Sequence, residues 1–269
     1  MKSKINDTQI YYEDVGKGTP VVFIHGLGAD SKDWTLVIPE LSKEIRCIVL
    51  DLRGHGQSDK PNQPYTMSLF AKDIVNLLDQ LGISSAYFCG TSMGGFVVLE
   101  AALRYPERVR GLILVDSAPY LPEHTIKLSG KWVETLLNKG PEALVEMQAE
   151  DAFHPLFSRR HPEIVNMYKE SKRNPSSETL GLINKGLQTE PVDYRKKIKQ
   201  IKAPILIIHG QDDKIIPFEN AEFIHKQVPN SQIAIFPLCG HALLLERPQF
   251  FIDLLLYFIE NTEKTKGTK

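Results

Sequence analysis

Short, unbroken runs of apolar residues recur along this chain, and most of them are separated by segments with helical spacing. Apolar runs of this length are typical of strands that are buried on both faces of a sheet. Helices between such strands cover the two faces of a mostly parallel sheet. We therefore predict an α/β fold with buried strands at residues 21–24, 48–50, 86–89, 112–115, 205–208 and 233–236.

The two ends of the chain complete this fold. Apolar residues on both sides of the turn-forming pair Asn6 and Asp7 predict an antiparallel hairpin, which brings the expected sheet to eight strands. Residues 68–81 and 250–259 have the spacing of helices that pack on a sheet. The charged residues 260–269 are expected to fray from the end of the second helix.

Residues 118–199 interrupt the alternation of strands and helices, because they contain no convincing buried strand. Prolines there separate stretches of helical spacing at residues 131–137, 141–149, 163–172 and 177–187. We predict a helical cap inserted into a single core, whose two parts are residues 1–117 and 200–269. The alternative is a structural excursion that takes no part in function.

A glycine-framed serine lies where the strand at residues 86–89 gives way to a helix. Gly90 and Gly94 stand two positions before and after Ser92. A sharp strand-to-helix turn strains the backbone of its central residue, and only small neighbours let the chain pass so closely. The strain turns the hydroxyl away from the sheet, so we expect Ser92 to be a nucleophile that faces a cleft.

Two downstream loops carry the base and the acid that a serine nucleophile requires at neutral pH. His241 follows the predicted strand at residues 233–236, and Asp213 follows the one at residues 205–208. Parallel strands bring their carboxyl ends to one edge of the sheet, so both loops can meet the loop of Ser92 there. We predict a catalytic triad in the chain order serine, aspartate, histidine, which differs from the orders of chymotrypsin and subtilisin.

A glycine-rich turn, His25-Gly26-Leu27-Gly28, directly follows the first buried strand. We expect the backbone N–H groups of Leu27 and Met93 to hold the oxyanion of the intermediate, and each such donor stabilises a transition state by about 2.7 to 4 kcal/mol. Apolar side chains of the helix after Ser92 and of the cap are expected to line the substrate pocket, namely Phe96, Trp132, Phe153 and Leu156.

These motifs resemble the α/β-hydrolase family, close to bacterial carboxylesterases, 3-oxoadipate enol-lactonases and cofactor-free haloperoxidase-type esterases. In that family the stretch around Arg53 is largely a structural loop, so the resemblance implies no chemical role for this arginine. The family spacing between Gly210 and Pro217 selects Asp213 over Asp212 as the acid. Some members take their acid from the position of Asp116, which stays a rival. The matching segments are residues 25–28, 51–59, 90–95, 210–217 and 240–241.

The resemblance and the serine together predict a carboxylesterase that hydrolyses short- to medium-chain esters through an acyl-enzyme. Related dehalogenases and epoxide hydrolases use an aspartate at the position of Ser92, so their alkyl-enzyme chemistry is excluded. Hydrolysis of an enol-lactone, cleavage of a C–C bond in a diketone and peracid formation with hydrogen peroxide stay open. A ligand-binding protein without turnover is a further alternative, because this fold hosts both classes.

The motifs of other kinds of binding site are incomplete in this sequence. The turn at residues 26–31 lacks the third glycine of a dinucleotide fingerprint, and residues 90–95 lack the Lys-Ser/Thr pair of a phosphate loop. His25, His55 and His209 lie in glycine turns or at a strand end, where we expect them to have structural roles. No metal-binding spacing of histidines or cysteines is present, so we predict neither a metal nor an organic cofactor.

Composition narrows the partners of the protein. The formal net charge is −1 and basic residues are dispersed, which disfavours nucleic acids and anionic membranes as partners. Three widely separated cysteines suit buried thiols in a reducing compartment. The polar residues 1–9 lack the apolar region of a signal peptide. We expect a cytoplasmic monomer or homodimer that acts on a small-molecule ester or lactone.

Overall fold

An eight-stranded sheet forms the centre of the computed structural model, which describes residues 1–172 and 177–267. Its strand order is β1-β2-β4-β3-β5-β6-β7-β8, and β1 and β2 are antiparallel to their neighbours while the remaining pairs are parallel. This confirms the predicted mostly parallel sheet. The strands are β1 (Lys2–Ile5), β2 (Thr8–Val15), β3 (Pro20–Ile24), β4 (Arg46–Leu50), β5 (Ala86–Thr91), β6 (Val109–Val115), β7 (Ile205–Gly210) and β8 (Ser231–Phe236).

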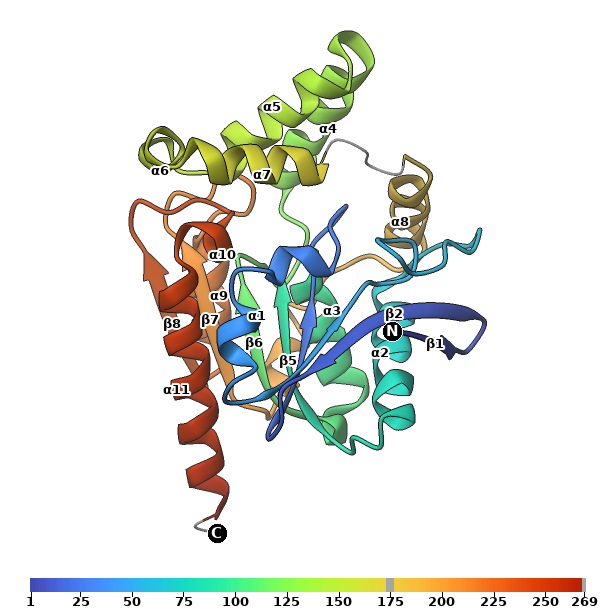
Figure 1. Ribbon diagram of the computed structural model, residues 1–269, viewed down its shortest axis with the longest axis vertical. Helices are drawn as coiled ribbons and strands as arrows, with labels where there is room; N and C mark the ends of the chain where they lie inside the picture. The colour runs from blue at the N-terminus through green and yellow to red at the C-terminus, as the bar shows by residue number, and fades with distance from the viewer. Residues whose placement is uncertain (173–176, 268–269) are drawn as a thin grey trace.

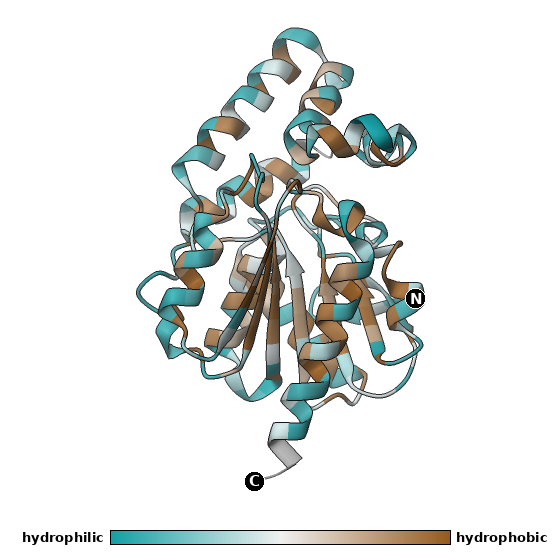
Figure 2. Cartoon of the chain, turned by 90° about the vertical axis from the view of Figure 1, so that its left-hand side faces the viewer, coloured by the Kyte–Doolittle hydropathy of each residue, from teal (hydrophilic) through white to brown (hydrophobic). Residues whose placement is uncertain are grey.

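The unbroken apolar runs have a direct structural cause, because the central strands bury side chains on both faces. Phe88 and Leu114 belong to the apolar cluster on one face, whereas Phe23 and Val115 belong to the cluster on the other. Figure 2 shows the strands as a hydrophobic layer between helices whose outer surfaces are largely hydrophilic. The core helices are α1 (Ile38–Leu41), α2 (Met67–Gln80), α3 (Met93–Arg104), α9 (Glu219–Gln227), α10 (Leu243–Glu246) and α11 (Pro248–Gly267), with 3₁₀ turns η1 (Ser31–Trp34), η2 (Pro106–Arg108) and η3 (Ile198–Gln200).

Among the described residues, five α-helices lie between β6 and β7 in the chain, where the sequence predicted a helical insertion. Figure 1 shows α4 to α7 beyond the end of the sheet from which β6 leads into α4. The sequence did not predict α6, which is only six residues long and begins at a proline. The helices are α4 (Glu123–Lys139), α5 (Pro141–Ala152), α6 (Pro155–Arg160), α7 (Pro162–Lys172) and α8 (Ser177–Thr189).

The predicted fraying of the C-terminal segment is wrong for residues 260–267, because α11 continues to Gly267. Residues 268–269 lie outside the described part. Glu263 explains the longer helix, since its carboxylate accepts a hydrogen bond of 2.7 Å from the Tyr87 hydroxyl and pairs with Arg110. These contacts tie the last turns of α11 to β5 and β6.

Strand β8 also differs from the prediction, because its apolar residues are only partly buried rather than enclosed on both faces. It is the last strand of the sheet, and within the described ranges it pairs with β7 alone. An apolar run therefore marks this strand correctly but does not reveal that it lies at an edge. No helix within the described ranges is long and apolar enough to cross a membrane.

Candidate active site

Ser92 occupies a strained turn between β5 and α3, as the sequence predicted. Its φ of 52° and ψ of −118° lie in a region that residues with a side chain rarely adopt. The turn is closely packed: a methyl group added at Gly90 would lie 2.3 Å from the carbonyl oxygen of Gly94, and one at Gly94 would lie 2.3 Å from that of Ile24. Both flanking glycines are therefore needed for the chain to pass so closely.

Neighbouring β6 holds the strained turn in place. The N–H of Ser92 donates to the carbonyl of Val115 at 2.9 Å, and the hydroxyl of Ser117 donates to the carbonyl of Ser92 at 2.9 Å. These bonds satisfy both backbone groups of Ser92. The turn is fixed by the sheet itself, so the hydroxyl is presented on a rigid element.

Asp213 and His241 meet at the same edge of the sheet, after β7 and β8. Asp213 Oδ2 lies 2.7 Å from Nδ1 of His241, and Oδ1 accepts the N–H groups of Ile215 and Ile216 at 2.8 and 2.9 Å. A carboxylate can only accept hydrogen bonds, so Nδ1 carries the hydrogen and Nε2 is free to accept a proton. This is the arrangement that a histidine base requires.

The structure separates Asp213 from the two rival acids. Asp212 is exposed at the surface of the same loop. Asp116 is buried, but its Oδ1 accepts the N–H of Gly210 at 2.9 Å. Among the three aspartates, only Asp213 hydrogen-bonds to His241 in the described residues.

The electrostatics of the pair favour an ionised carboxylate and a basic imidazole. Burial raises the pKa of Asp213, but the charge of His241 and the hydrogen bonds from His209 and His241 outweigh it and bring the pKa below the ordinary 3.8. Burial lowers the pKa of His241, but the Asp213 carboxylate outweighs it and raises the pKa above the ordinary 6.5. His241 is therefore a stronger base than a free histidine.

Ser92 and His241 lie at the same sheet edge, yet no hydrogen bond joins their side chains among the described residues. Hydrogen bonds between a nucleophile and its base are often long without substrate and shorten when substrate is bound. The side chain of His241 is 13 % exposed, so its ring is accessible from solvent.

The predicted oxyanion turn lies directly against Ser92. A methyl group added at Gly26 would lie 3.3 Å from Cβ of Ser92. The N–H of Leu27 makes no hydrogen bond within the described chain, and Met93 is the first residue of α3, whose N–H has no partner inside the helix. The N–H groups of Leu27 and Met93 therefore both remain available as donors, one in the turn against Ser92 and one on the residue that follows it.

His25 fixes the shape of this turn. Its Nδ1 donates to the carbonyl of Gly26 at 2.8 Å, and its Nε2 accepts the N–H of Leu52 at 3.0 Å. This pattern requires a neutral ring, and burial lowers the pKa of His25 to about 4. His55 packs beside it with ring centroids 4.8 Å apart, and burial lowers its pKa to about 3. Both rings are therefore neutral, and His25 anchors the turn.

Glu246 joins the His241 loop to the inserted helices, a role that the sequence analysis missed. Its Oε1 accepts the N–H of Gly240 at 2.8 Å and that of His154 at 3.2 Å. The N–H of Ala242 also donates to the carbonyl of Ala152 at 2.9 Å. The signal available in the sequence was an acidic residue within the apolar stretch before Arg247. Its hydrogen-bond partners could not be identified from the sequence.

The four predicted pocket residues lie in different surroundings. Phe96 is buried on α3, and Trp132 on α4 donates from Nε1 to Asp151 at 2.8 Å. Phe153 is buried where α5 ends, and its backbone belongs to the segment that packs on Gly240. Leu156 is 39 % exposed and lines a small pocket of about 110 Å³ with residues that do not include Ser92 or His241.

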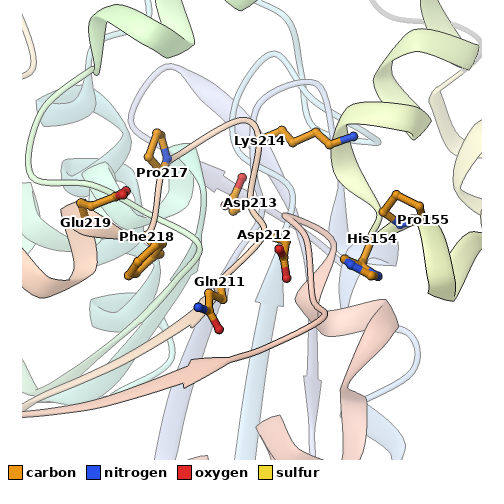
Figure 3. A pocket seen from close by; sticks show the side chains of 9 residues that line it. All are labelled: His154, Pro155, Gln211, Asp212, Asp213, Lys214, Pro217, Phe218 and Glu219. Atoms are coloured by element: carbon orange, nitrogen blue, oxygen red, sulfur yellow. The ribbon is translucent and has the colours of Figure 1, made fainter.

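A larger pocket of about 500 Å³ borders the acid loop. Figure 3 shows the loop that follows β7 on one side and His154 and Pro155 on the other. The lining includes Asp213 but neither Ser92 nor His241, so this pocket is a neighbour of the candidate site. The lining residues are His154, Pro155, Gln211, Asp212, Asp213, Lys214, Pro217, Phe218 and Glu219.

One set of potential metal ligands occurs among the described residues, formed by Asp116, His209 and Asp213. One ligand atom from each lies within 4.8 Å of the others, and all three residues are buried. Both oxygens of Asp213 already accept hydrogen bonds, so a cation would have to compete with His241 and two backbone N–H groups. The predicted absence of a metal stays a prediction.

Comparisons of sequence and of structure show which known proteins this chain resembles. Residues 19–248 match the family model described as alpha/beta hydrolase fold. The chain is 30% identical to 2-hydroxy-6-oxo-2,4-heptadienoate hydrolase of Pseudomonas putida over 254 residues, which are 91% of each protein. A thermophilic esterase from Thermogutta terrifontis superposes with a TM-score of 0.88 at 28% identity, covering 97% of this chain and 99% of the esterase. The enol-lactonase from Burkholderia xenovorans LB400 gives 0.86 at 25% identity, covering 97% and 100%. The chain therefore belongs to the α/β-hydrolase fold family.

Proposed function

We propose that this protein is a carboxylesterase that hydrolyses short- to medium-chain esters through a Ser-His-Asp triad. The observation that carries the proposal is the convergence of a strained, glycine-framed Ser92 and a carboxylate-bound His241 at one sheet edge. Similarity to a known esterase over nearly the whole chain supports the same reaction class.

In the proposed mechanism, Nε2 of His241 takes the proton of Ser92 as the serine oxygen attacks the ester carbonyl. Asp213 holds the tautomer of His241 and stabilises the imidazolium that forms. The N–H groups of Leu27 and Met93 donate to the oxyanion. The imidazolium then protonates the leaving alcohol. Water, deprotonated by His241, attacks the acyl-enzyme, and the acyl–serine bond breaks as the imidazolium returns its proton to the serine oxygen.

Helices α4 to α8 act as the cap in this proposal, with residues 118–199 inserted between two parts of the core. Their connection to the His241 loop through Glu246 and the Ala152 carbonyl supports a role at the site rather than a remote excursion. Phe96 on α3 and Phe153 at the end of α5 are proposed to border the acyl chain, because α3 begins at the Ser92 turn and the Phe153 backbone packs on Gly240.

A second candidate is cleavage of an activated C–C bond or of a lactone. Two similarities favour it, because one relative is named as a heptadienoate hydrolase and one structural neighbour as an enol-lactonase. Both reactions can use the same serine, base and oxyanion donors, since each passes through an oxyanion at the attacked carbonyl. The choice depends on which substrate the core and the inserted helices admit to Ser92.

Steady-state hydrolysis of a series of p-nitrophenyl esters of increasing acyl length tests the proposal, with 3-oxoadipate enol-lactone measured beside it. We expect turnover of the short esters, a maximum of kcat/KM at short to medium length and loss of activity in Ser92→Ala. Rapid opening of the lactone with negligible ester turnover would replace the carboxylesterase assignment by the lactonase. No turnover of either would contradict both.

The pH dependence of turnover follows from the raised pKa of His241. His241 accepts the serine proton only in its neutral form, so kcat/KM should rise with pH through a midpoint above 6.5 and fall about tenfold per pH unit below it. The measurement is kcat/KM for a p-nitrophenyl ester from about pH 5 to about pH 9, followed at the isosbestic wavelength of nitrophenol. An acid limb with a midpoint below 6.5 would contradict the Asp213–His241 pairing.

A further inference from the structure

The loop that carries His241 is held by hydrogen bonds on both flanks of the histidine. The N–H of Gly240, one residue before His241, donates to Oε1 of Glu246 at 2.8 Å. The N–H of Ala242, one residue after it, donates to the carbonyl of Ala152 at the end of α5 at 2.9 Å. The loop is therefore anchored at the two backbone groups that frame the histidine.

Glu246 extends this anchor into the inserted helices. The Oε1 atom that accepts the N–H of Gly240 also accepts that of His154 at 3.2 Å, in the segment between α5 and α6. The two backbone segments also pack closely, because a methyl group added at Gly240 would lie 2.5 Å from the carbonyl oxygen of Ala152 and 3.1 Å from the nitrogen of His154. The loop and residues 152–154 must therefore move together unless these contacts break.

An acidic residue is unexpected in the surroundings of Glu246. It is the last residue of α10, and its helix neighbours Leu243 and Leu244 are buried in an apolar cluster. Glu246 is 5 % exposed, and its second oxygen, Oε2, is buried without a hydrogen-bond partner among the described residues. Burial of a carboxylate costs free energy that an apolar side chain would avoid. The two N–H groups on Oε1 are contacts that an apolar side chain could not replace.

We propose that Glu246 is a positioning residue that locks the loop of His241 to the cap segment of residues 152–154, so that the cap sets the position of the base. Glu246 contacts no reacting atom and acts through the backbone of Gly240. The inference rests on the proposed function, because that function makes His241 the base. It adds a link through which the cap affects the chemical step as well as the pocket.

This link predicts that Glu246 affects kcat more than KM. A base displaced by about 1 Å can lose about a hundredfold in rate, because proton transfer depends on the geometry of the reacting atoms. Glu246 is buried and offers no surface to a substrate, so substrate binding should change much less.

The first test replaces Glu246 by alanine and by glutamine. Glu246→Ala removes the acceptor of both N–H groups, so kcat for a p-nitrophenyl ester should fall by about a hundredfold while KM stays within about threefold. Glu246→Gln loses the charge but keeps an oxygen for both donors, so kcat should return to within about threefold of the wild type. An equal loss of kcat in both variants would overturn the proposal, and so would a loss confined to KM.

Glu100→Ala is the matched control, because it removes another buried glutamate at a distance from the loop. Glu100 lies on α3 and pairs with Arg104. Its loss should lower the thermal stability while leaving kcat unchanged. A fall of kcat in this control as large as that in Glu246→Ala would show a general effect of destabilisation and would overturn the proposal.

The second test cuts the link at the cap while keeping Glu246. Proline lacks the N–H that His154 donates, and the φ of −67° at this position suits the proline ring. His154→Ala keeps the N–H and loses the imidazole, so the ratio of kcat between the two variants measures the bond to Glu246. We expect His154→Pro to be at least about tenfold slower than His154→Ala. Equal kcat values would overturn the proposal.

The double variant tests whether both substitutions break the same link. His154→Pro should cause no further loss of kcat in the background of Glu246→Ala, because the bond between the two residues is already absent. Fully additive losses would mean two independent effects and would overturn the proposal. If Glu246→Ala does not fold, the comparison of His154→Pro with His154→Ala decides alone.

Hydrogen exchange separates this inference from the proposed function, because it needs no substrate. The N–H of Ala242 bonds to the carbonyl of Ala152, and the substitutions at positions 246 and 154 leave both groups in place. Loosening of the loop should speed its exchange by at least about tenfold in Glu246→Ala and not in Glu100→Ala. Faster exchange in a protein that hydrolyses no ester would support the link and reject the esterase. Ester turnover that depends on Ser92, with exchange and kcat unchanged in Glu246→Ala, would keep the esterase and reject the link.

Discussion

Replacing Ser92 by alanine is expected to reduce kcat for a p-nitrophenyl ester by at least about a thousandfold. The reason is that the proposed acyl-enzyme forms on the serine oxygen, and no other hydroxyl is held in the strained turn between β5 and α3. The N–H groups of Leu27 and Met93 would remain, so slow turnover above the uncatalysed rate should persist. Steady-state kinetics with purified wild-type protein and variant measure the difference.

The fold of the variant is not expected to change, because the contacts that hold the turn come from the backbone of Ser92. Its N–H bonds to Val115 and its carbonyl accepts from Ser117, and alanine keeps both groups. Circular dichroism and thermal unfolding are the controls. A covalent label from an organophosphate, located by mass spectrometry, should appear at Ser92 in the wild type and be absent in the variant. Full esterase turnover in the folded variant would reject the mechanism.

The sheet was predictable because its strands carry an unusual signal. Strands that bury both faces are uniformly apolar, and such runs identified β3 to β8 from the sequence. The same signal could not tell a central strand from an edge strand, as the partly buried β8 illustrates. The length of α11 was missed for a related reason, since its last turns are held by Glu263 through Tyr87 and Arg110, far away in the chain.

The candidate site also has a part that the sequence predicts and a part that depends on long-range contacts. Ser92, Asp213 and His241 follow strand ends, and parallel topology alone predicts that such positions converge. His209 and Glu246 carry no motif, and their importance depends on contacts formed only in the fold. Glu246, for example, accepts the N–H of His154, which lies 92 residues earlier in the chain. The cap pocket is the least predictable part, because its residues come from helices whose packing the sequence does not specify.

Asp213→Asn is expected to lower kcat/KM by about a thousand- to ten-thousandfold while leaving the loop intact. The asparagine oxygen can still accept the N–H groups of Ile215 and Ile216. Its amide nitrogen would then face Nδ1 of His241, and because the amide donates, Nδ1 must become the acceptor. The ring hydrogen would move to Nε2, the atom that has to accept the proton of Ser92, so the base would be held in the wrong tautomer.

The neighbouring Asp212 provides a control that differs by one position in the chain. Asp212→Asn removes the same charge from the same loop, but its exposed side chain makes no hydrogen bond to His241 in the described residues. We expect its kcat/KM to stay within about twofold of the wild type. Equal losses in the two variants would mean that loop charge rather than tautomer control governs the rate. A large loss only in Asp212→Asn would mean that Asp212, and not Asp213, is the acid of the triad. His241 would then have to rotate away from Asp213 during turnover.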